Sequence, residues 1–142
     1  MKKLGLISIL VLSLGAFLMV ACGKKEDTPV DQFIEVMDQA TKKAEEIKSM
    51  ADVYNVQEIL SPQEGWEIIR NNADYPLTDS DKKKLKKSFD KLLRVGYEKT
   101  VEYSGLPEEL KKQSLAQVDL IIEGANKMID NAQTFGEISG IK

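Results

Sequence analysis

The sequence predicts an all-α protein, built as a small up-down helical bundle of three long helices plus one short helix. Apolar residues recur at steps of three and four along several segments, which places them on one face of a helix. These segments begin with capping residues or with proline, as helices commonly do. The chain contains no run of alternating β-branched residues and no hairpin-turn dipeptide, the two features typical of strands.

The first 21 residues have the pattern of a secretory signal peptide. Lys2 and Lys3 give a short basic start, and an apolar stretch then runs from Leu4 to Val20. This stretch is close to the minimum length of a membrane-spanning helix, about 17 residues. An uncleaved membrane anchor is therefore the alternative to a cleaved signal, and cleavage with no further attachment would give a soluble secreted form.

Cys22, the only cysteine of the chain, ends this segment within Met19-Val20-Ala21-Cys22-Gly23. The segment resembles the lipobox of bacterial lipoproteins, although Met19 and Val20 stand where Leu and a small residue are usual. The resemblance implies cleavage before Cys22, a diacylglycerol on its sulfur and possible acylation of its amino group. It also accounts for an odd cysteine in an exported chain. Since Gly23 is not Asp, the resemblance favours the outer membrane in an organism with two membranes.

Residues 22–28 then form a lipidated tether, and the first long helix is expected from 29 to 54. Thr28 supplies its N-cap, Pro29 its first position and Asp31 an acid in the first turn. Its apolar stripe consists of Val30, Phe33, Met37, Ala40, Ala44, Ile47, Ala51 and Tyr54.

Three further helices are expected, over residues 62–72, 79–104 and 107–134. The short one follows a capping box at Ser61-Pro62-Gln63-Glu64. The next is capped at Thr78 and ends at Gly105, and Pro107 begins the last. The apolar side of helix 79–104 comprises Leu85, Phe89, Leu92, Leu93, Gly96 and Tyr103, and that of helix 107–134 comprises Leu115, Val118, Ile122, Ala125, Ile129 and Ala132. The bundle domain thus spans residues 29–134, and we expect residues 135–142 to be a flexible tail, because they show no apolar period.

Composition excludes several classes of function. The formal charge of −3 includes Lys2 and Lys3, so the chain without residues 1–21 carries about −5, which disfavours nucleic acid. The chain has no histidine, and no P-loop, G-x-G-x-x-G or G-x-S-x-G motif. We expect no metal, no cofactor and no enzymatic activity. The acidic pairs Glu45-Glu46 and Glu108-Glu109 are interpreted as a solvated face and as helix N-terminal charge rather than catalytic groups.

Three features are candidates for function. Trp66 is either a core anchor or an exposed binding residue, and with Tyr75 and Pro76 it is placed to line a pocket or partner groove at one end of the bundle. Gly96 lies on the apolar side of its helix, where we expect close packing against Ala125 or a ring of the first helix. A basic face, which either contacts anionic lipid headgroups or is simply solvated, carries Lys83, Lys87, Lys91 and Arg94.

The sequence therefore favours a lipid-anchored, non-enzymatic envelope protein that presents a helical bundle to an unknown envelope protein. The alternative is a binder of a small apolar or anionic ligand in the bundle. An enzyme that uses only carboxylates or tyrosines is the third interpretation.

Overall fold

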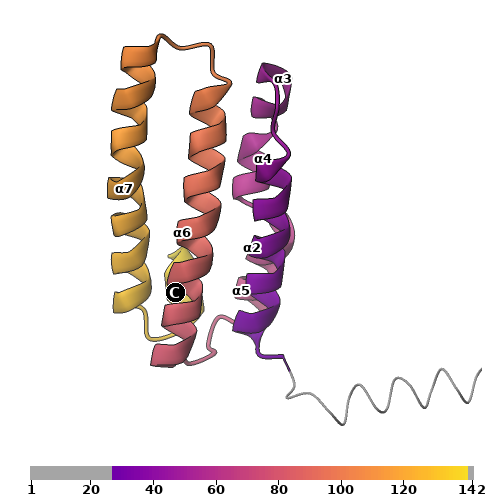
Figure 1. The fold of residues 1–142 in the computed structure, drawn as a ribbon. Helices are drawn as coiled ribbons and strands as arrows, with labels where there is room; N and C mark the ends of the chain where they lie inside the picture. The colour runs from indigo at the N-terminus through magenta and orange to yellow at the C-terminus, as the bar shows by residue number, and fades with distance from the viewer. Residues whose placement is uncertain (1–26, 141–142) are drawn as a thin grey trace, which may run out of the picture.

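The computed structural model describes residues 27–140, which form an all-α fold with no strand among them. The predicted signal peptide, Cys22 and most of the tether lie outside the described residues. Three long helices form a row: α2 (Pro29–Glu45), α6 (Asp79–Glu102) and α7 (Glu108–Asn131). Figure 1 shows α6 between the other two, and α6 packs against both. Within residues 27–140, no helix is long and apolar enough to cross a membrane.

Short helices α3 (Met50–Val53), α4 (Val56–Leu60) and α5 (Gln63–Asn71) connect α2 to α6, where the sequence predicts only one. The prediction of one helix over 29–54 is wrong beyond Glu45. Ser49 starts a new helix, since its hydroxyl accepts a hydrogen bond from the Asp52 backbone N–H, and the Asp52 carboxylate accepts one from the Lys48 N–H. Ala51 and Tyr54, the last two members of the predicted stripe, are consequently exposed.

The predicted helix starts are confirmed at α2 and α6. In each, a threonine hydroxyl accepts from the N–H three residues later, and the aspartate there accepts from the threonine N–H (Thr28 with Asp31, Thr78 with Asp81). The capping box predicted at Ser61 is not formed. Pro62 is the N-cap of α5, and the Ser61 hydroxyl instead accepts a hydrogen bond from the indole N–H of Trp66.

The core lies between the row of long helices and the short elements that cover one side of it. Phe33 of α2 is at its centre, 5.7 Å from the ring of Phe89 and 5.5 Å from that of Phe135. Buried residues from α2, α6 and α7 follow the predicted stripes closely, although Leu115 of α7 is exposed. Gly65 lets α5 approach the ring of Phe33, to which an added Cβ would come within 3.1 Å.

Residues 135–140 are part of the core, contrary to the prediction of a flexible tail. They contain the 3₁₀ helix η1 (Gly136–Ser139), and Phe135 and Ile138 are buried. The segment is held by the loop before α6, because the Phe135 N–H donates to the Tyr75 carbonyl (2.9 Å) and the Gly136 N–H to the Ala73 carbonyl (2.8 Å). Gly136 is required there, since a Cβ would lie 2.8 Å from that of Ala73.

Candidate functional site

An apolar cavity of about 170 Å³ opens where α5, α6, α7 and η1 meet, and we call it the Trp66 cavity. Its lining is entirely apolar: Trp66, Ile69, Phe89, Ala125, Met128, Ile129 and Ile138. Ile69, Ile129 and Ile138 are buried and form its floor, whereas Trp66 and Met128 are exposed at its edge. Exposed apolar groups around a hollow are typical of a surface that binds another molecule.

Trp66 is held in place from two sides. Its indole N–H donates to the hydroxyl of Ser61, five residues earlier. Gly65, the residue before Trp66, lets the start of α5 pack closely against the ring of Phe33. A second, much smaller apolar hollow, about 20 Å³, lies between Trp66, Phe89 and the α4–α5 connection. The indole is nevertheless 40% exposed, so Trp66 is a surface residue at the cavity edge rather than a core anchor.

Tyr75 and Pro76 do not line the Trp66 cavity. The loop that contains them pairs instead with the segment after α7, through an isolated bridge between Pro76 and Thr134. Tyr75 is half-buried and packs against the hydrophobic core. The structure therefore separates Tyr75 from Trp66 and gives it a role in holding the C-terminal segment. Sequence reasoning missed Ile138 and Met128 as neighbours of Trp66, because no local pattern indicates that η1 folds back.

The basic side chains of α6 divide into two groups. One group pairs with the neighbouring long helices. Lys84 Nζ lies 2.9 Å from Asp31 Oδ1 of α2, and Lys86 Nζ lies 2.7 Å from Asp130 Oδ1 of α7. The hydrogen bond to Lys84 lowers the pKa of Asp31 below its ordinary value. These pairs tie α6 into the row of helices.

Arg94 belongs to the same group, unlike the three lysines predicted with it. Its guanidinium lies 3.1 Å from Asp119 of α7 and 3.4 Å from Asp90, and the hydrogen bond with Asp119 raises the pKa of Arg94. The other group is Lys83, Lys87 and Lys91, which are exposed and make no salt bridge to any residue from 27 to 140. The described residues thus leave three of the four predicted positions on a solvated face.

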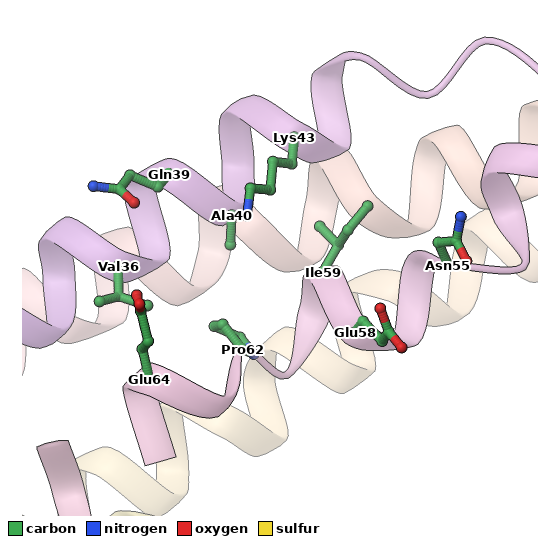
Figure 2. Close-up of a pocket in the computed structure, with 9 residues that line it drawn as sticks. All are labelled: Val36, Gln39, Ala40, Lys43, Asn55, Glu58, Ile59, Pro62 and Glu64. Atoms are coloured by element: carbon green, nitrogen blue, oxygen red, sulfur yellow. The ribbon is translucent and has the colours of Figure 1, made fainter. Parts of the chain in front are cut away.

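A third hollow, about 340 Å³, runs between α2 and the α4–α5 segment, and Figure 2 shows its lining. Lys43 of α2 and Glu58 and Glu64 of the short helices give it mixed charge. The sequence did not predict this groove, because it exists only where α2 stops and the chain turns back as α3 and α4. Across residues 27–140, no cluster of acidic, histidine or cysteine side chains is arranged to hold a metal ion.

Comparison with known proteins adds no family to this description: no protein-family model, no curated protein and no solved structure matches the chain.

Proposed function

We propose that this is a non-enzymatic, lipid-anchored protein of the bacterial cell envelope whose helical domain binds another protein through the Trp66 cavity. The lipobox resemblance at Cys22 supports the anchor and, with Gly23, an outer-membrane position where two membranes exist. The observation that carries the binding proposal is the wholly apolar cavity with a partly exposed tryptophan at its edge. Tryptophan is enriched among the residues that dominate binding energy at protein interfaces.

The size of the Trp66 cavity favours a protein side chain over a free ligand. Pockets for small molecules usually enclose about 300–1,000 Å³, whereas an apolar cavity of about 150 Å³ takes a molecule of the size of benzene. At about 170 Å³, the Trp66 cavity accommodates one aromatic or leucine-sized side chain. A partner helix or loop that inserts one such side chain fits it better than a lipid or a larger metabolite does.

A small apolar ligand of a single ring is the second candidate, and the same cavity supports it. Trp66 is the only tryptophan, so its emission reports directly on anything that enters. Titration of the purified protein with low concentrations of benzene or toluene, which do not emit where tryptophan does, should leave the emission unchanged if the cavity serves a protein partner. A saturable change, abolished by Met128→Phe to fill the opening without adding a second tryptophan, would favour the ligand instead.

The lipid anchor is tested by mass spectrometry of the protein extracted from membranes. The expected result is a chain that begins at Cys22 and carries the added mass of diacylglycerol, with or without a third acyl group. An intact Met1 with an unmodified thiol would contradict the proposal.

The binding site is tested by chemical crosslinking in intact cells with Trp66→Ala, Trp66→Phe and a matched control, Tyr54→Ala. Tyr54 is an exposed aromatic residue outside the Trp66 cavity, at 82% exposure. We expect the crosslinked complex to be lost with Trp66→Ala, reduced with Trp66→Phe and retained with Tyr54→Ala, while all three variants keep the helical circular dichroism of the parent. Equal complex formation by Trp66→Ala and Tyr54→Ala would refute the site.

A further inference from the structure

One face of α7 exposes large apolar side chains at intervals along most of the helix. Six positions at alternating steps of four and three lie on this face, and we call them the α7 strip: Leu110, Ser114, Gln117, Ile121, Gly124 and Met128. Leu110, Ile121 and Met128 are exposed, and Leu120 beside them is 67% exposed. Such regular spacing is typical of a helix that packs against another helix.

No described part of the chain covers the α7 strip. Figure 1 shows α7 at one edge of the row of long helices, with α6 on its inner side, and α7 packs against α6 and η1. The residues that make this packing, such as Val118, Ile122 and Ile129, lie on the neighbouring face and are buried. The α7 strip is therefore surplus to the internal core.

Gly124 leaves room for a close neighbour on the α7 strip. Glycine inside an exposed helix lowers its stability relative to alanine, and is usually kept where another backbone comes close. A Cβ at Gly96, Gly65 or Gly136 would contact a neighbour within the fold, but at Gly124 it would meet nothing within 4 Å. The surface at Gly124 is therefore open, with room for a close neighbour from outside residues 27–140.

We propose that a second copy of this chain covers the α7 strip, with the two α7 helices packed antiparallel about a two-fold axis. The six positions of the strip are placed symmetrically about residue 119, so their spacing is the same toward the N-terminus as toward the C-terminus. An antiparallel copy places Leu110 opposite Met128, Ser114 opposite Gly124, and Gln117 opposite Ile121. Leu120 then lies beside its own symmetry mate, as a two-fold contact requires. The small pair of Ser114 and Gly124 lets the two backbones approach.

Charge at the ends of the strip fits the same arrangement. Glu109 and Lys127 are both exposed and lie on the outer side of the α7 strip, the side that carries Leu120. Lys127 also pairs with Glu123 of its own helix at 2.8 Å, an exposed pair that leaves room for a second carboxylate. In an antiparallel pair the Glu109 of one copy faces the Lys127 of the other, twice per dimer. A parallel pair would instead place like charges side by side.

The contact is small, so the dimer should be weak in dilute solution. From Leu110 to Met128 the strip spans about 27 Å, a single helix–helix contact, which is less than the roughly 800 Å² per partner of a standard interface. Confinement of both copies to one membrane surface, as proposed above, raises their effective concentration and favours the pair. The proposal is accordingly tested with the full chain in its own membranes.

Leu120→Cys tests the two-fold contact, because a residue beside the axis meets itself. Membranes that contain this variant are treated with a short bis-maleimide, beside the parent chain and a control, Glu35→Cys, on the outer side of α2. We expect a covalent dimer with Leu120→Cys and its loss when Ile121→Glu is added, with no dimer from the parent or the control. A Leu120→Cys dimer no more abundant than the Glu35→Cys dimer, or a crosslink to a different protein alone, would overturn the proposal.

The antiparallel register is tested by charge reversal in the Leu120→Cys chain. Glu109→Lys and Lys127→Glu should each weaken the crosslink, and the double reversal should restore it, because opposite charges face each other again between copies. Failure of the double reversal to restore the dimer would contradict this register. Mass spectrometry of the same membranes shows whether Cys22 carries lipid, which separates failure of the anchor from failure of the dimer. Met128 borders both the α7 strip and the Trp66 cavity, and it is unchanged in all of these variants.

Discussion

Replacement of Gly96 by leucine should destabilise the domain, whereas the same replacement at Gly124 should not. Gly96 faces Leu60 of α4, and an added Cβ would overlap Leu60 Cδ2 and lie 3.3 Å from its Cγ. This neighbour differs from the Ala125 or first-helix ring expected from the sequence, because the turn into α4 brings Leu60 onto α6. A leucine side chain extends the overlap by three further carbons, so Leu60 must leave its place against the core.

The magnitudes separate the two positions clearly. Overpacking of a core lowers the free energy of unfolding by about 1–3 kcal/mol. Leucine has a better helix propensity than glycine, but this raises the free energy of unfolding by only about 0.8 kcal/mol. We therefore expect Gly96→Leu to lower the free energy of unfolding by up to about 2 kcal/mol. At Gly124 the propensity gain stands without a clash, so Gly124→Leu should be neutral or stabilising by up to about 0.8 kcal/mol. In a domain of this size, 1 kcal/mol moves Tm by about 4 °C.

The assay is urea unfolding of the chain without residues 1–22, followed by circular dichroism and by the emission of Trp66. Dilute protein keeps self-association through the α7 strip from contributing. The variants Gly96→Ala and Gly124→Ala add a smaller side chain at the same two positions and should differ in the same direction as the leucine variants. Equal shifts of the unfolding midpoint for the two leucine variants, or a larger loss at Gly124, would refute the reasoning about the face of α6.

Three further results are expected. The chain without residues 1–27 should fold cooperatively with a strongly helical spectrum, because the core residues of the described structure lie between Val30 and Ile138; a non-cooperative melt would contradict this. The pKa of Asp31 is lowered, so the stabilising charge of Asp31 is fully present above the ordinary pKa of 3.8 and is lost as the pH falls further. The Asp31→Asn variant should therefore lose less stability than the parent on acidification, and an equal loss would argue against the Asp31–Lys84 pair. Vesicles of anionic lipid should bind the soluble domain only weakly in low salt, given its net negative charge; tight binding removed by reversal of Lys83, Lys87 and Lys91 to Glu would make α6 a membrane-contact helix.

The long helices could be predicted because their information is local. The three-four spacing of Val30, Phe33 and Met37 and the threonine caps before α2 and α6 act within one or two turns, and the structure retains them. The end of α2 was missed because the apolar period continues through Ala51 and Tyr54, while the hydrogen bonds around Ser49 and Asp52 break the helix.

The site was only partly predictable, because it is made by contacts distant in sequence. Trp66 could be singled out as the only tryptophan, but its neighbours Met128 and Ile138 come from α7 and η1. The fold-back of η1 depends on backbone hydrogen bonds between the loop before α6 and residues 133–136, which no periodicity reveals. The ion pairs of Lys84, Lys86 and Arg94 likewise follow from the placement of α6 between two acidic neighbours.

Position-specific photocrosslinking in living cells tests the central proposal, a protein-binding site at the Trp66 cavity, most directly. A photoreactive analogue of tryptophan that retains the indole ring is placed at residue 66 of the full chain, and at Glu35 on the outer side of α2 as the control, and the products are identified by mass. We expect one discrete adduct with another envelope protein from position 66 and none from position 35. The absence of any protein adduct at position 66, or the same adducts from both positions, would contradict it.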